Sequence, residues 1–145
     1  MPHLIHKSQE NLKAASMLIG QELYASSVHC SYYAMLQHLT CKLQVAMNIT
    51  LDELSAKIES DDRTAHKFLF QETLKFLNKK ANEKTIFLEK NVMISQVQRL
   101  KSKLQDIKTL RIESDYKNIQ IDNNKGLKAY NTSQNIINEL NTYYT

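Results

Sequence analysis

The scarcity of helix-breaking residues limits what this chain of 145 residues can form. It contains two glycines and one proline, and the proline lies at position 2. Sheet proteins need glycine and proline for their many tight turns, whereas leucine, lysine, glutamine, glutamate and alanine favour helix. The sequence therefore predicts an all-α fold. Its length suits one domain, residues 1–145, with a hydrophobic core of its own.

Hydrophobic periodicity gives the expected positions of the helices. They are predicted at residues 3–19, 22–48, 50–58, 63–79, 86–118 and 125–143. Apolar residues recur every three or four positions in the second and fifth of these segments, as in helices packed into a bundle. In the fifth segment this stripe comprises Met93, Val97, Leu100, Leu104 and Ile107. Gly20 is expected to end the first helix, because glycine tolerates the positive φ found at many helix C-termini.

The stripe of the fifth segment continues into polar residues. Its next positions are Arg111 and Ser114, with Asp115 also inside the stripe and Tyr116 about a third of a turn away. Burying a charge costs several kcal/mol unless the charge is paired. One interpretation is a structural Arg111–Asp115 pair, or a helix end that has left the core. The other is a polar functional site set into the wall of the bundle.

Basic residues are concentrated in one part of the chain. Between residues 75 and 111 there are ten Lys and Arg residues against three acidic residues, a net charge of +7, whereas the rest of the chain carries −3. Clustered positive charge suggests a polyanion such as RNA, and Lys101, Lys103 and Lys108 are the candidate phosphate contacts. The alternative is an ordinary lysine-rich surface exposed to solvent.

Several classes of protein lack support in the sequence. None of the nine Glu residues is followed by a His three positions later, as a di-iron bundle requires. There is no Walker loop, glycine-rich dinucleotide turn or HExxH motif, so no metal and no cofactor are expected. No apolar run approaches the roughly 20 residues of a membrane span, and the charged N-terminus does not resemble a signal peptide. We expect a cytoplasmic protein without a membrane partner.

The remaining polar residues suggest chemistry on a phosphate group. Arg111 can bind a phosphate bidentately, and Asp115, Tyr116 and His66 are the other candidate catalytic residues. Tyr33 and His29 are candidate binding residues on the second helix. Such a set suits RNA cleavage without a metal, in which the ribose 2′-hydroxyl is the nucleophile. A lone His such as His66 on an inner helix face also fits a structural, hydrogen-bonded role.

These residues carry a resemblance to a known family. The segments concerned are Leu23-Tyr24-Ala25, Ser31-Tyr32-Tyr33-Ala34, His66, and Arg-x-x-x-Asp-Tyr at positions 111–116. The chain resembles HEPN-domain proteins of the short bacterial type over roughly residues 5–120. The resemblance implies an up-and-down four-helix bundle with an additional short helix. It also implies a homodimer with the Arg111 regions near the interface, a nucleotidyltransferase partner, and a role in a toxin–antitoxin or phage-defence module.

The sequence departs from the catalytic HEPN pattern at one position. Catalytic members have an Arg followed, after four to six residues, by a His, whereas no His follows Arg111 and Tyr116 occupies the nearest spacing. With a reference pKa near 10, tyrosine is a poorer general base at neutral pH. The expected function is therefore RNA or nucleotide binding with partner interaction. The alternatives are a metal-independent HEPN ribonuclease toxin and a structural dimerisation module.

Overall fold

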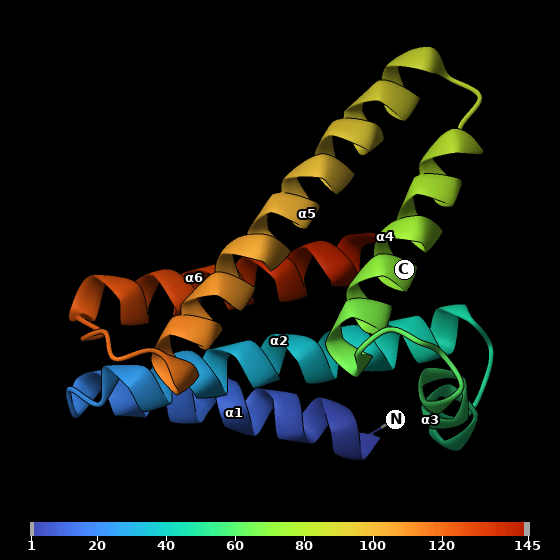
Figure 1. Ribbon diagram of the computed structural model, residues 1–145. Helices are drawn as coiled ribbons and strands as arrows, with labels where there is room; N and C mark the ends of the chain where they lie inside the picture. The colour runs from blue at the N-terminus through green and yellow to red at the C-terminus, as the bar shows by residue number, and fades with distance from the viewer. Residues whose placement is uncertain (1, 144–145) are drawn as a thin grey trace.

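A computed structural model describes residues 2–143 of the chain, and these residues form helices and connecting turns without a strand. The helices are α1 (Pro2–Gly20), α2 (Tyr24–Ala46), α3 (Leu51–Glu59), α4 (Ala65–Asn82), α5 (Phe87–Tyr116) and α6 (Asn123–Tyr143) (Figure 1). The predicted all-α bundle is confirmed, and α3 is its short helix. Among the described residues, no helix is both long enough and apolar enough to cross a membrane.

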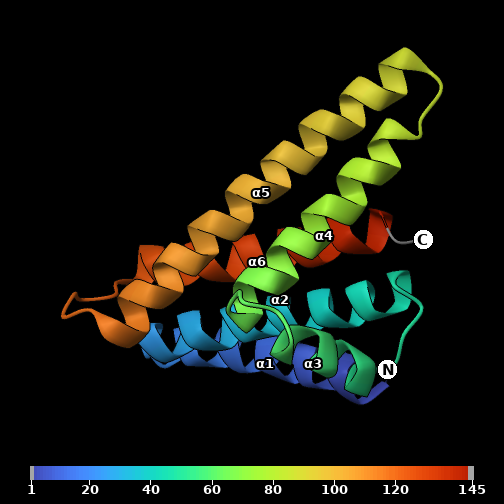
Figure 2. The ribbon, with the colours of Figure 1, turned by 45° about the vertical axis from the view of Figure 1, so that its right-hand side comes forward.

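Helix α2 is the centre of the bundle, because it packs against every other helix. Its buried side chains point to several sides of the helix and include Val28, Tyr32, Met35, Leu39 and Leu43. Such all-round burial is expected for a helix in the interior of an α-domain. Helices α1 and α6 run along α2, whereas α4 and α5 cross it (Figures 1 and 2).

Buried hydroxyl groups tie the flanking helices to α2. Ser8 of α1 donates to the carbonyl of Ala34 at 2.6 Å, and Ser133 of α6 donates to the carbonyl of Ser31 at 2.7 Å. Each bond satisfies a polar group that would otherwise be costly to bury. Both faces of α2 therefore carry polar groups as well as apolar contacts, which the hydrophobic stripes alone do not predict.

Helices α4 and α5 form a hairpin that extends beyond the layer formed by α1, α2 and α6 (Figures 1 and 2). The predicted stripe of α5 is confirmed: Met93, Val97, Leu100, Leu104 and Ile107 are all buried. At the opposite end from the hairpin tip, the last turns of α5 lie over the N-terminal half of α2 (Figure 1). This crossing brings the polar end of the stripe against the polar side chains of α2.

The prediction for Gly20 is wrong in one respect. Gly20 is the last residue of α1, but no glycine has a positive φ, and Glu22 adopts φ 61° instead. Leu23 N–H donates to the Leu18 carbonyl at 2.9 Å, and Glu22 N–H donates to the Ile19 carbonyl at 3.0 Å. These are the two bonds of a Schellman motif, whose left-handed residue is two positions later than predicted.

Candidate functional site

The side chain of Arg111 lies at the centre of a polar cluster and is only 15% exposed. Its Nε atom is 3.1 Å from Oδ2 of Asp115, one turn later on α5. Nε makes no hydrogen bond in this arrangement, so the contact is an ion pair. Nη2 donates to the hydroxyl oxygens of Tyr33 and Tyr116, at 3.2 and 3.3 Å. Among the described residues, no hydrogen bond involves Nη1, so this nitrogen is free to donate to a ligand.

Three tyrosine rings surround the guanidinium group. Its central carbon lies 5.3 Å from the ring of Tyr32, 5.8 Å from that of Tyr33 and 5.3 Å from that of Tyr116. These distances are within the range of cation–π interactions. Burial alone would lower the pKa of Arg111, but the three phenol groups raise it, so the group stays charged. Tyr116 is 71% exposed and forms the solvent side of this aromatic cluster.

Asp115 links the end of α5 to α2. Nδ1 of His29 lies 3.2 Å from both carboxylate oxygens of Asp115, and the ring of His29 packs 4.6 Å from that of Tyr33. The side chain of Asp115 is 18% exposed and that of His29 is 50% exposed. The carboxylate therefore lies between a guanidinium group and an imidazole contributed by two different helices.

His66 joins the cluster from the first turn of α4. Its Nδ1 atom lies 2.9 Å from the hydroxyl of Tyr32, and its ring centre is 6.1 Å from that of Tyr33. Burial lowers the pKa of His66, and the positive charges of Arg111 and Lys108 lower it further. Burial also raises the pKa of the Tyr32 phenol well above its usual value. Both groups are therefore neutral at pH 7.

The structure brings together all six cluster residues that the sequence singled out. They come from three helices and are Arg111, Asp115, Tyr116, His66, Tyr33 and His29. Tyr32 is a fully buried core residue, and its hydroxyl lies within hydrogen-bond distance of His66. No sequence signal identifies this role, because the partner of a buried hydroxyl depends on how the helices cross.

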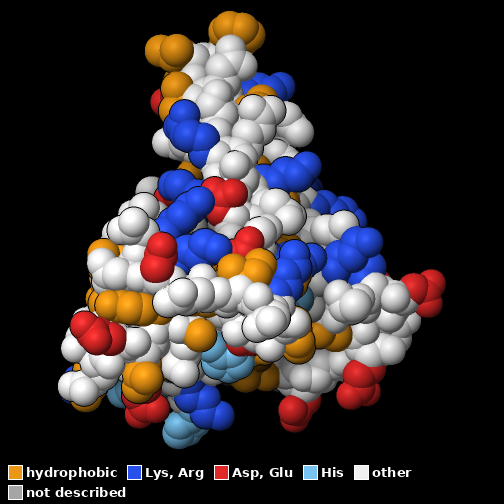
Figure 3. Space-filling view, turned by 60° about the vertical axis from the view of Figure 1, so that its left-hand side comes forward, with side chains coloured by type: hydrophobic (Ala, Val, Ile, Leu, Met, Phe, Trp, Pro, Cys, Tyr) orange, Lys and Arg blue, Asp and Glu red, His pale blue; other side chains and the backbone are white. Residues whose placement is uncertain are grey.

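The three predicted lysines divide between two places. Lys101 and Lys108 line a groove of about 290 Å³ between α4 and α5, and Lys67 of α4 completes its basic rim. Lys103 is instead paired with Glu139 of α6. Lys67 lies outside the basic stretch of the sequence and reaches the groove only because α4 packs beside α5. Lys and Arg side chains gather over this hairpin (Figure 3).

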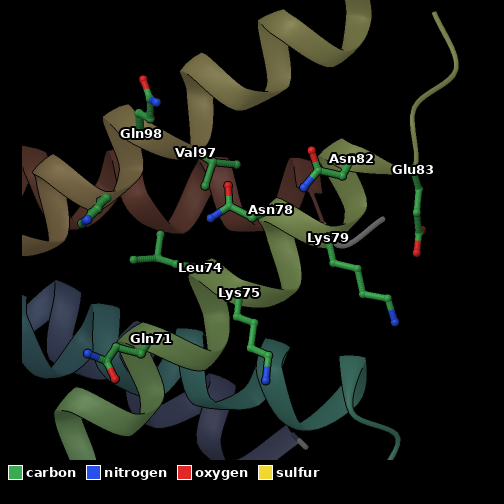
Figure 4. Close-up of a pocket in the computed structure, with 10 residues that line it drawn as sticks. Gln71, Leu74, Lys75, Asn78, Lys79, Asn82, Glu83, Val97 and Gln98 are labelled. Carbon is green, nitrogen blue, oxygen red and sulfur yellow. The ribbon is translucent and has the colours of Figure 1, made fainter.

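The groove continues along the hairpin into a larger hollow of about 880 Å³, with which it shares Gln71, Leu74 and Lys101. Side-chain amides are prominent in its lining: Asn78 and Asn82 from α4 and Gln98 from α5, besides Gln71. Leu74 and Asn78 face α5, whereas Lys75 and Lys79 point away from it (Figure 4). The lining thus contains several groups that both donate and accept hydrogen bonds.

A third hollow, of about 470 Å³, lies on the other side of the cluster. It is lined by Ala25, Ser26, His29, Cys30, Ser114, Asp115 and Tyr116. Burial raises the pKa of the Cys30 thiol, so this side chain stays protonated. Ser114 donates to Oδ1 of Asp115 at 3.4 Å. His29 presents a half-exposed imidazole ring to this hollow. The carboxylate of Asp115 fixes the orientation of that ring.

Lowering the pH from about 7.5 to about 5.5 is expected to reduce the free energy of unfolding. Burial holds the pKa of His66 and of His38 below the ordinary value of 6.5. The unfolded chain therefore takes up protons as the pH falls through 6.5, whereas the folded chain does so only at lower pH. Stability is thus highest above this value and decreases below it. Thermal melts across this range measure the change.

The variant His38→Gln provides the comparison for this pH dependence. Nε2 of His38 lies 2.8 Å from Oδ1 of Asn141, and the amide of glutamine can donate a similar bond. The variant should lose less stability than the original chain as the pH falls. If both proteins lose the same amount of stability as the pH falls, His38 does not contribute to the pH dependence.

Comparisons with known proteins leave the family of the chain open. No protein-family model matches the sequence, and no curated protein matches it either. Within residues 2–143, no three His, Cys, Asp or Glu side chains are grouped closely enough to hold a metal ion. The function is therefore inferred from the geometry of the cluster and of the groove beside it.

Proposed function

We propose that the chain binds single-stranded RNA across the Arg111 cluster and the groove between α4 and α5. The main support for this proposal is the position of the Arg111 guanidinium group. Three tyrosine rings surround it, its Nη1 atom makes no hydrogen bond among the described residues, and it lies beside a groove rimmed by lysines. The positive charges of Arg111 and of Lys108, which lines the groove, both lower the pKa of His66, so the groove begins close to the cluster.

Each part of this surface suits a different part of an RNA strand. Lys67, Lys101 and Lys108 are suited to phosphate groups along the groove. The exposed ring of Tyr116 offers a face on which an unpaired base can stack. The amides of the larger hollow match the donors and acceptors on base edges. Unpaired bases are accessible to such contacts, whereas paired bases in an RNA helix are not.

We further propose that the chain is a HEPN-like domain. Support comes from the meeting of Tyr33, His66 and Arg111, which are far apart in the sequence and belong to the segments that carry the resemblance. On this proposal the chain forms a homodimer and works with a nucleotidyltransferase partner in a toxin–antitoxin or defence module. The exposed Tyr116 then lies in the region expected near the dimer interface.

Binding of fluorescently labelled, random-sequence single-stranded RNA, followed by anisotropy, tests the proposed function. Affinity should fall steeply as the salt concentration rises, because lysines that contact phosphates release bound cations. A double-stranded RNA of the same length should bind more weakly. Absence of binding at low salt, or binding that ignores salt, would contradict the proposal.

A further inference from the structure

We infer that the tip of the α4–α5 hairpin, residues 84–92, enters the surface of a membrane that contains anionic lipids. The tip carries four large apolar side chains that are exposed to solvent: Ile86 (57% exposed), Phe87 (79%), Leu88 (72%) and Val92 (48%). Single exposed apolar residues are common, whereas a contiguous group of them marks a surface that binds a partner. The inference goes beyond the proposed RNA binding, which uses the Arg111 cluster and the groove.

The apolar residues of the tip occupy a place where a polar residue would stabilise the start of a helix. Helices α3 and α4 begin after Thr50 and Thr64, whose hydroxyls accept from backbone N–H groups of the first turn. Helix α5 begins after Ile86, which makes no such bond. The first N–H groups of α5 therefore have no side-chain cap, and their partial positive charge lies at the tip. This end of the helix suits the phosphate of a lipid headgroup better than it suits an apolar partner.

The tip is the outermost part of a hairpin that extends beyond the layer formed by α1, α2 and α6 (Figures 1 and 2). Hydrophobic side chains gather at this end of the molecule (Figure 3). A lipid surface accepts a projecting apolar tip of this kind, whereas a protein partner would need a matching pocket. Entry into the interface needs no spanning helix. The inference therefore departs from the expectation of no membrane partner, which was based on the absence of a spanning segment and of a signal peptide.

Positive charge around the tip favours anionic lipids. Between residues 79 and 92 there are four lysines against two glutamates: Lys79, Lys80, Lys84 and Lys90 against Glu83 and Glu89. Lysines near an anionic surface are attracted to it, and their long side chains can keep the charge at the headgroups while apolar neighbours enter. Two copies that met tip to tip would instead bring their net positive charges together. The charge thus favours a membrane over a second copy as the partner of the tip.

The tip lies at the opposite end of α5 from the Arg111 cluster. Arg111 follows Phe87 by 24 positions on this helix, which corresponds to about 36 Å along its axis. Electrostatic interactions are screened within about 8 Å at physiological salt, so a membrane at the tip acts little on Arg111. A chain bound to a membrane by its tip would therefore leave the Arg111 cluster accessible.

Flotation of the intact chain with lipid vesicles, without RNA, tests the inference. We expect the chain to bind vesicles of phosphatidylcholine with about one-third phosphatidylglycerol at least tenfold more tightly than vesicles of phosphatidylcholine alone. Phe87→Ser and Leu88→Ser combined should weaken binding to the anionic vesicles by about tenfold or more. The matched control combines Met17→Ser and Val45→Ser, which removes two apolar side chains that are 63% and 62% exposed elsewhere. The control should bind as the original does.

A fluorescent reporter shows whether the tip itself enters the lipid. The chain has no tryptophan, so Phe87→Trp places a single one at the tip. Its emission should shift to shorter wavelength when anionic vesicles are added, because the ring leaves water. Absence of this shift, or a shift that needs only a higher protein concentration and no lipid, would overturn the inference. The second result would show that another copy covers the tip.

The outcome is independent of the proposed RNA binding. The Phe87→Ser and Leu88→Ser variant should bind single-stranded RNA as the original does, because neither residue lines the groove. Unchanged vesicle binding by this variant, or an equal loss in the control, would overturn the membrane contact and leave the proposed RNA binding in place. Vesicle binding without RNA binding would support the membrane contact and overturn the proposed function.

Discussion

Replacing Arg111 with alanine is expected to weaken RNA binding by about tenfold to a hundredfold. The substitution removes the nitrogen that is free for a phosphate, together with two hydrogen bonds to the hydroxyls of Tyr33 and Tyr116. It should also lower the free energy of unfolding by about 2 kcal/mol. This loss is smaller than for a fully buried pair, because Asp115 keeps His29 as a partner and is 18% exposed. Anisotropy and thermal melts on the same protein measure the two effects.

Two comparison variants test whether these effects are specific to Arg111 and whether they depend on the shape of its side chain as well as on its charge. Arg99→Ala removes an exposed arginine from the same helix and should change neither quantity appreciably. Arg111→Lys keeps a positive charge but loses the planar group that stacks between tyrosine rings, so it should recover binding only in part. A loss of stability with unchanged RNA binding would show that the Arg111–Asp115 pair is structural only.

Replacing the three groove lysines with glutamine is expected to have the second large effect. In Lys67→Gln, Lys101→Gln and Lys108→Gln combined, three phosphate contacts are lost from one groove. The slope of log affinity against log salt should become shallower by about 2, since each contact with a single strand contributes about 0.7. The affinity at low salt should fall accordingly. Stability should change little, because these side chains lie at the surface.

Lys103 supplies the matched control for this experiment. It belongs to the same basic stretch of the sequence, but its side chain is paired with Glu139 on α6. Lys103→Gln should therefore leave the salt dependence of binding unchanged. If Lys103→Gln weakens binding as much as the groove variants do, the groove is not the contact surface. RNA binding would then depend on the total positive charge of this stretch and not on where each lysine lies.

The fold could be predicted from the sequence because its signals are local. The interval of three and four residues between Met93, Val97 and Leu100 defines a buried face without reference to any other helix. Thr50 likewise caps α3 by accepting from the backbone N–H of Glu53, as the pattern of a Thr followed three residues later by a Glu suggests. The left-handed residue after α1 could not be placed as readily, because glutamate at position 22 gives no sign of it.

The residues of the candidate site could be predicted from the sequence, but most of the contacts between them could not. Arg111 and Asp115 are one turn apart on one helix, so their pairing follows from helix geometry alone. The contact between His29 and Asp115 joins positions 86 residues apart and depends on where α5 crosses α2. The same holds for Lys67, which shares a groove with Lys108 only because α4 and α5 form a hairpin. Contacts of this kind come from tertiary packing, which periodicity within one helix does not encode.

An NMR titration of the isotopically labelled protein with single-stranded RNA is the most direct test of the proposed RNA surface. We expect shifts in the resonances of Tyr33, His66, Lys101, Lys108 and Arg111 at RNA concentrations that match the affinity measured by anisotropy. The side-chain resonances of Lys103 and the residues on the exposed face of α1 should stay unchanged. Shifts confined to other surfaces, or no shifts at all, would contradict the proposal that the Arg111 cluster and the α4–α5 groove form one RNA-binding surface.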